Sequence, residues 1–160
     1  MKIYNSLTRQ KEEFKPLEEN KVKMYACGIT VSGKAHIGHA IQAMVFDIIR
    51  KYLEKKGYKV TYARNYTDVD DKIIANALKL NVNAMDFAKE NMQAIDLSMQ
   101  KLGVDKPTME LKATETIPQI IEFIEKLIEK GYAYSTSEGD VYYDVKKFKE
   151  YGKLSHRNLE

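Results

Sequence analysis

The segment from Val22 to Lys56 constrains the fold more than any other part of the chain. A short apolar run at 22–26 is typical of a buried strand, a glycine-bearing stretch follows, and residues 40–56 repeat with the period of an amphipathic helix. A strand that leads through such a turn into a helix presents free backbone N–H groups and the helix dipole at the turn. The sequence therefore predicts an anion site there, with a phosphate as the expected ligand.

The next residues extend this unit to β-α-β. Gly57 stands where a helix end must turn left-handed, and residues 59–64 alternate as a second strand does. A parallel unit of this kind places its ligand crevice at the carboxyl ends of the strands. We expect an α/β fold with a Rossmann-like parallel sheet and flanking helices.

Further elements follow along the chain. The pattern predicts helices over 71–80 and 84–102, and a third that starts near 116–118 and ends at Gly131. Residues 132–135 and 141–144 flank a five-residue loop, which is typical of a β-hairpin. Before residue 21, only the pair Ile3-Tyr4 indicates a short strand.

Composition excludes some classes of protein. A single cysteine cannot form an internal disulfide and fits a reducing compartment. No run approaches the roughly 20 apolar residues that a membrane helix needs, so we expect a cytoplasmic protein without membrane contact. A net charge of +3 is too small to indicate nucleic acid by itself.

The opening motif allows several interpretations. Residues 28–35 match the P-loop pattern G-x-x-x-x-G-K, but Ala35 replaces the Ser or Thr that should hold Mg²⁺. Alternatively, His36 and His39 share one helix face and could stabilise charge on a triphosphate. The two histidines could also only cap and pack the helix, or join Cys27 and His156 in a zinc site.

Separated motifs in order carry a resemblance. These are Cys27-Gly28-Ile29-Thr30-Val31, His36-Ile37-Gly38-His39, Asn65-Tyr66-Thr67-Asp68-Val69-Asp70-Asp71-Lys72-Ile73-Ile74 and Tyr151-Gly152-Lys153-Leu154-Ser155. Together they resemble the amino-terminal part of a bacterial-type cysteinyl-tRNA synthetase, a class I aminoacyl-tRNA synthetase. The resemblance covers essentially the whole chain, which makes the P-loop match accidental.

The resemblance implies an enzyme that activates cysteine with ATP and Mg²⁺ and transfers it to the tRNA for cysteine. It implies catalysis by His36 and His39, with ATP bound by Thr30, Gly38 and the same histidines. Cysteine would contact Cys27, Gly28 and Thr67. Cys27 would also be a zinc ligand, and it is the one zinc ligand that this chain supplies. A thiolate-binding zinc would select cysteine over serine.

By the same resemblance, residues 1–131 form the first half of a Rossmann-type ATP-binding catalytic domain, and residues 132–160 start a connective insertion. A carboxyl-terminal half with the remaining zinc ligands and a lysine-bearing ATP loop is then missing. The chain departs from the family at Ser32-Gly33, where polar residues are usual. Three alternatives stay open: a free-standing nucleotide-binding remnant, a half enzyme that needs a partner, and a cysteine–amino-sugar ligase.

Asp68, Asp70 and Asp71 raise a separate question, because their spacing suggests a calcium loop. The Gly and Glu expected at positions six and twelve of an EF-hand are Ile73 and Lys79. We therefore expect these acids to cap a helix and line the site rather than to catalyse.

Overall fold

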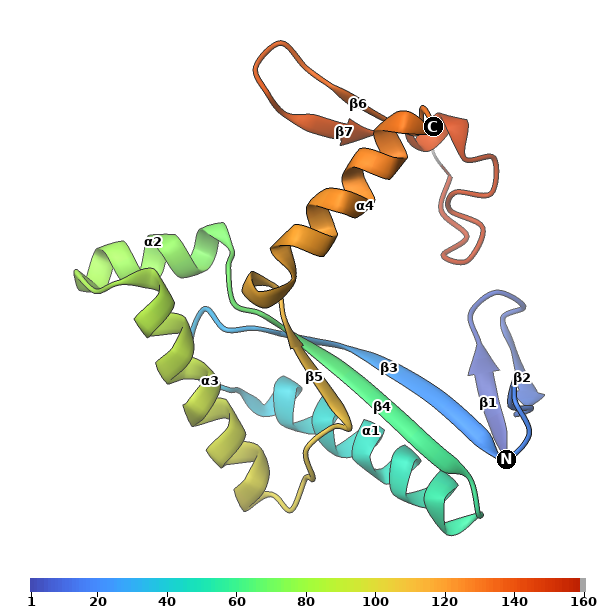
Figure 1. Ribbon diagram of the computed structural model, residues 1–160. Helices are drawn as coiled ribbons and strands as arrows, with labels where there is room; N and C mark the ends of the chain where they lie inside the picture. Colours follow the sequence, from blue (N-terminus) through green and yellow to red (C-terminus); the bar gives the residue numbers. More distant parts are fainter. Residues whose placement is uncertain (159–160) are drawn as a thin grey trace. The chain divides into compact units, whose positions relative to one another are not determined.

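The computed structural model describes residues 1–158 and divides the chain into two compact units (Figure 1). The central unit comprises residues 16–116, and the terminal unit comprises residues 1–15 together with the chain from 117 onward. This division groups helix α4 (Ile117–Glu129) with the hairpin that follows it. The domain boundary after residue 131, expected from the sequence, differs from it and stays a prediction.

A three-stranded parallel sheet forms the centre of the central unit. Its order is β3 (Lys21–Thr30), β4 (Lys59–Thr67) and β5 (Met109–Lys112). Helix α1 (Ile37–Lys55) connects β3 to β4, and helices α2 (Asp71–Leu80) and α3 (Ala84–Lys101) connect β4 to β5 (Figure 1). The expected α/β fold with a parallel sheet and flanking helices is confirmed, whereas strand β5 was not expected.

The core lies between one face of this sheet and the three helices. Ile29 of β3 and Tyr66 of β4 are register partners, and both are almost fully buried. Residues from every helix of the unit pack against them: Ala43, Ile73, Ala88, Ile95 and Met99. Because this cluster lies beside the ends of β3 and β4, it fixes where those strands deliver their last residues.

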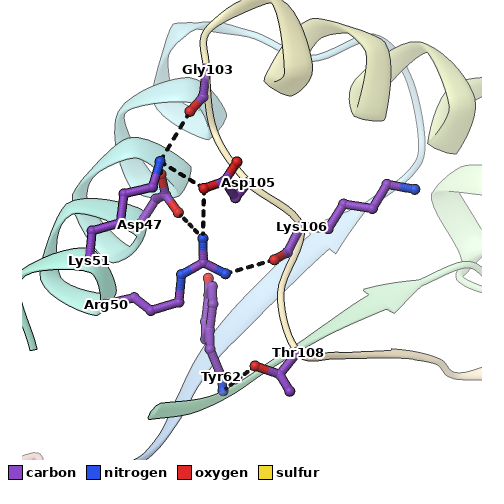
Figure 2. Close-up of polar contacts among 8 residues, drawn as sticks. All are labelled: Asp47, Arg50, Lys51, Tyr62, Gly103, Asp105, Lys106 and Thr108. Carbon is purple, nitrogen blue, oxygen red and sulfur yellow. Dashed lines mark hydrogen bonds and ion pairs between the residues drawn. The ribbon is translucent and has the colours of Figure 1, made fainter. Parts of the chain in front are cut away.

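A polar cluster holds the carboxyl-terminal half of α1 (Figure 2). Arg50 and Asp47 are both buried, and their ion pair measures 2.5 Å. Arg50 also donates to the carbonyl of Lys106 at 2.7 Å, while Lys51 pairs with Asp105 at 2.9 Å. Removing one partner of a buried pair leaves an uncompensated charge, which is strongly destabilising. The cluster therefore ties α1 to the loop between α3 and β5.

The terminal unit contains two antiparallel hairpins, helix α4 and the short 3-10 helix η2 (Val145–Lys147) among its described residues. Strand β1 (Lys2–Asn5) pairs with β2 (Gln10–Glu13), and β6 (Ala133–Ser135) pairs with β7 (Val141–Tyr143). The second hairpin and its loop at 136–140 were predicted from the sequence. The first was expected only as one short strand at Ile3-Tyr4. None of the helices within residues 1–158 has the length and apolar character that a membrane crossing needs.

Candidate functional site

The first turn of α1 is closed by two histidines. His36 is the N-cap, and its Nδ1 accepts a hydrogen bond from the Gly38 N–H at 3.1 Å. The His36 N–H in turn donates to Nδ1 of His39 at 3.4 Å. This reciprocal arrangement is a capping box built with imidazoles, and it satisfies two of the free N–H groups of the helix end. The predicted strand–turn–helix is present, although α1 begins three residues before residue 40.

Gly38 allows this arrangement because its missing side chain leaves room for an imidazole. The rings of His36 and His39 stack with their centroids 3.7 Å apart. A Cβ on Gly38 would lie 2.9 Å from Cε1 of His36, so any side chain there would force the ring to rotate. The stacking of the two histidine rings therefore requires glycine at position 38, the second residue of α1.

The hydrogen bonds also fix the tautomer of both rings in their neutral form. A backbone N–H can only donate, so each Nδ1 carries a lone pair and a neutral ring holds its proton on Nε2. Partial burial and, after it, the electrostatic interaction with the neighbouring His36 ring lower the pKa of His39 below its ordinary value of 6.5. His39 is therefore a neutral hydrogen-bond donor through Nε2 at neutral pH.

Strand β3 reaches the turn through a β-bulge. The register with β4 pairs Ala26 with Arg64 and then Ile29 with Tyr66, so Cys27 and Gly28 together face one residue, Asn65. A Cβ on Gly28 would lie only 1.4 Å from the Asn65 carbonyl oxygen. Glycine at this position is therefore required by the close approach of the neighbouring strand.

An open hollow of about 440 Å³ lies where these parts meet. Four predicted site residues line it: Gly28, Thr30, His36 and His39. Lys34 and Lys72 line it as well, and their ammonium groups add positive charge beside the helix N-terminus. A concave site with a helix N-terminus and two lysines suits an anion such as a phosphate.

The other predicted residues lie around this hollow. Thr67 is the last residue of β4 and pairs with Thr30 of β3. Cys27 has an exposed side chain, and its carbonyl accepts a hydrogen bond from Gln42 of α1 at 3.1 Å. Gly38 lies in the first turn of α1 and is not among the residues that line the hollow.

Sequence reasoning missed three residues that shape the site. Lys72 and Asn65 lie inside the motif at 65–74, which singled them out without giving them a role. Gln42 carries no signal, because a glutamine on a helix is ordinary until its partner on another element is known. Asn65 and Gln42 act through contacts with residues distant in the sequence, and Lys72 lines the hollow only because the fold brings the start of α2 there.

The P-loop interpretation conflicts with the backbone. A P-loop needs residues 28–33 as a loop that surrounds phosphate. In the structure β3 continues through Thr30, so the first glycine of the pattern is part of a strand. The match of residues 28–35 to the pattern is therefore accidental, as the resemblance indicated.

Metal binding is tested by the donor set. Within residues 1–158, no group of three or more His, Cys, Asp or Glu side chains is arranged to hold a metal ion. His156 is in the terminal unit, where its Nε2 lies 2.9 Å from the Ser6 carbonyl oxygen. Cys27 alone does not meet the usual requirement of about four zinc ligands. The described residues therefore do not form a zinc site by themselves.

The acids after β4 have structural contacts. Asp70 is the N-cap of α2 and accepts from the Lys72 N–H at 2.8 Å. Asp68 is buried and accepts from the Thr114 N–H at 3.0 Å. The expected capping role is confirmed for Asp70, while Asp68 ties the end of β4 to the start of the short 3-10 helix η1 (Thr114–Thr116) that follows β5.

Comparison with known proteins gives this geometry a family. The family model for the catalytic domain of class I (C) tRNA synthetases matches residues 13–160. The chain belongs to this family. The resemblance read from the separated motifs is thereby confirmed.

Curated relatives match the chain from end to end. It is 51% identical over 160 residues to the cysteine–tRNA ligase of Francisella tularensis subsp. novicida strain U112, and the match covers 100% of the chain and 35% of that ligase. A ligase from Francisella tularensis subsp. tularensis strain WY96-3418 is also 51% identical, with 34% of its length covered. The chain thus spans about a third of these class I synthetases, at their amino-terminal part.

A solved class I synthetase shows the same fold. The leucyl-tRNA synthetase (LeuRS) of Agrobacterium radiobacter K84, crystallised as a ternary complex with tRNA and LeuAMS, superposes with a TM-score of 0.58 at 24% identity. The superposition covers 75% of this chain and 16% of that one. At this identity the likeness supports the fold and carries no residue roles.

Proposed function

We propose that this chain is the amino-terminal part of the catalytic domain of a cysteine–tRNA ligase. The complete enzyme would join the cysteine carboxylate to the α-phosphorus of ATP with release of pyrophosphate, and would then pass the cysteinyl group to a hydroxyl of its tRNA with release of AMP. The observation that carries this proposal is the hollow between the end of β3 and the start of α1, lined by Gly28, His36 and His39, with Cys27 next to Gly28 in the chain. End-to-end identity of 51% with named ligases supports it.

The histidines would act as fixed hydrogen-bond donors to the phosphates. Their Nδ1 atoms are engaged in the helix cap, so Nε2 is the atom left to donate. Donors held in place before the reaction stabilise charge that grows on the phosphates as pyrophosphate leaves. Thr30 and Gly38 would contribute to ATP binding, while Gly28 and Thr67 would border the cysteine. The domain boundary after residue 131 is part of the same proposal.

Metals enter the proposal only in part. Mg²⁺ would accompany ATP as its counter-ion. Zinc would need ligands from outside residues 1–158 in addition to the Cys27 thiolate, because the described donor set is insufficient. We also infer that a carboxyl-terminal segment of the complete protein supplies those ligands and contacts the tRNA. The single cysteine and the ATP and tRNA substrates fit a cytoplasmic location.

Cysteine-dependent exchange of pyrophosphate into ATP tests this function in a complete protein of the relatives' length. We expect His36→Asn and His39→Asn each to lower kcat about 100-fold with a smaller change in the KM for ATP, because their contacts strengthen in the transition state. Lys34→Ala should have a much smaller effect. His156→Asn, in the terminal unit, is the matched control and should behave as wild type.

Two results would contradict the proposal. One is a complete protein with no cysteine-dependent exchange. The other is normal pyrophosphate exchange in both histidine variants together with lost nucleotide binding in Lys34→Ala. That result would support the P-loop interpretation instead.

A further inference from the structure

Strand β3 changes the face that it presents to the core at the bulge. Before the bulge, Val22 and Ala26 are buried while the side chain of Cys27 is exposed. After it, Ile29 and Val31 are buried, although simple alternation would place them on the same face as Cys27. The extra residue therefore lets Cys27 stay outside the core while Ile29 enters it.

One side chain of β4 holds the bulge in place. Oδ1 of Asn65 accepts the Gly28 N–H at 2.8 Å, at the point where the regular register stops. The same oxygen accepts the hydroxyl of Tyr25 at 2.8 Å. Because both donors need an oxygen, the orientation of the Asn65 amide follows from these bonds.

The remaining contacts extend this clip to the rest of the site. Nδ2 of Asn65 lies 3.4 Å from Oγ1 of Thr67, at the end of β4. Gln42 holds the carbonyl of Cys27 from the other side. The peptide unit between Cys27 and Gly28 is thus bound at its oxygen by α1 and at its nitrogen by β4.

We propose that Asn65 is a positioning residue for Cys27 and Gly28, the part of the site where the cysteine substrate would bind. It acts through Gly28, Tyr25 and Thr67, fixing the Cys27 thiol on the exposed face of β3 at the level of Asn65. This inference rests on the proposed function for the identity of the substrate. The clip itself can be measured without any substrate.

Amide hydrogen exchange at Gly28, followed by NMR on the 160-residue chain, measures the clip. Asn65→Ala removes the acceptor and should speed exchange about tenfold. Asn65→Asp keeps oxygen acceptors for Gly28 and Tyr25, so protection should stay within about threefold of wild type. Asn91→Ala is the matched control, because Asn91 is a buried polar residue of α3 whose side chain donates to the Phe87 carbonyl, far from the bulge in sequence.

Cysteine-dependent exchange of pyrophosphate into ATP by the complete protein measures the consequence for substrate binding. Asn65→Ala should raise the KM for cysteine about tenfold while leaving the KM for ATP within about twofold, and Asn65→Asp should recover most of the cysteine KM. A merely structural role would instead lower the active fraction and move neither KM. Asn65→Gln, which misplaces the same amide by one methylene, is the second variant if Asn65→Ala does not fold.

The outcomes separate the two proposals. Unchanged Gly28 protection in Asn65→Ala or Asn65→Gln would overturn the clip. Faster amide hydrogen exchange at Gly28 together with an unchanged KM for cysteine would overturn the positioning role of Asn65. A wild-type complete protein without cysteine-dependent activity would instead refute the proposed function, while the Gly28 measurement would still report on Asn65.

Discussion

The histidine pair, His36 and His39, and the segment Cys27-Gly28 belong to one strand–helix connection. Local contacts hold the first, whereas residues distant in the sequence hold the second. His36 and His39 bond to each other and to Gly38, all within one helical turn. Cys27 and Gly28 are held by Gln42 and by Asn65, which lies 37 positions beyond Gly28. A site can thus combine a self-contained local device with one that exists only after the sheet has formed.

The strongest test of this contrast is Gly28→Ala. The new Cβ would meet the Asn65 carbonyl oxygen, a backbone atom that cannot rotate away, so β3 and β4 would have to separate. We expect a loss of about 3 kcal/mol in the free energy of unfolding, measured by urea titration of the 160-residue chain. Gly33→Ala is the control, since no atom lies within 4 Å of its added Cβ. Equal losses in both variants would show that the bulge has no special need for glycine.

A smaller effect is expected at the histidine pair from Gly38→Ala. Here the added Cβ meets only the His36 ring, which can rotate and give up its cap. Losing the cap costs about 1 kcal/mol, and alanine returns part of that through its helix propensity, so net stability should change by less than about 1 kcal/mol. NMR shifts of the His36 ring should nevertheless show the loss of stacking. A ring that keeps its shifts would disprove the steric account.

The smallest effect concerns pH. The pKa of His39 is lowered in the folded chain, so the unfolded chain binds more protons as pH falls below 6.5. The contribution of His39 to stability is present above pH 6.5 and is lost as pH falls through the lowered folded value. The thermal midpoint should therefore drop slightly between about pH 7.5 and about pH 5.5. Carboxylates with lowered pKa values, such as Glu12 and Glu18, start from 4.5 and titrate below this window.

His39→Asn should flatten this pH dependence, whereas His156→Asn should retain it. The difference between the two variants is the relevant measurement, because both remove one imidazole. A slope that persists unchanged in His39→Asn would assign the effect to another group.

The same contrast explains what the sequence could predict. Helix α2 was predicted at its observed bounds of Asp71–Leu80, since its cap, period and end are local signals. Strand β5 was missed because Met109–Lys112 is short and lacks β-branched residues, and it is a strand only through pairing with β4. Likewise β3 was predicted to end at Ala26, because the bulge interrupts the alternation that marks a strand.

For the candidate site, the local half was again the predictable half. The pattern His36-Ile37-Gly38-His39 places both imidazoles at the start of α1 through its spacing alone. The role of Asn65 could not be predicted from the sequence, because it depends on a bulge in another strand. The functional roles of the predicted site residues stay predictions until the exchange assays are done.

The bulge also limits how this strand can change during evolution. Between Val22 and Ile29 the chain has one residue more than its partner strand, and that single surplus decides which side chains face the core. Deleting it would turn Cys27 toward the core or push Ile29 and Val31 out of it, and a second insertion would do the same. The length of this segment in residues therefore has to stay constant, just as residue 28 has to stay glycine.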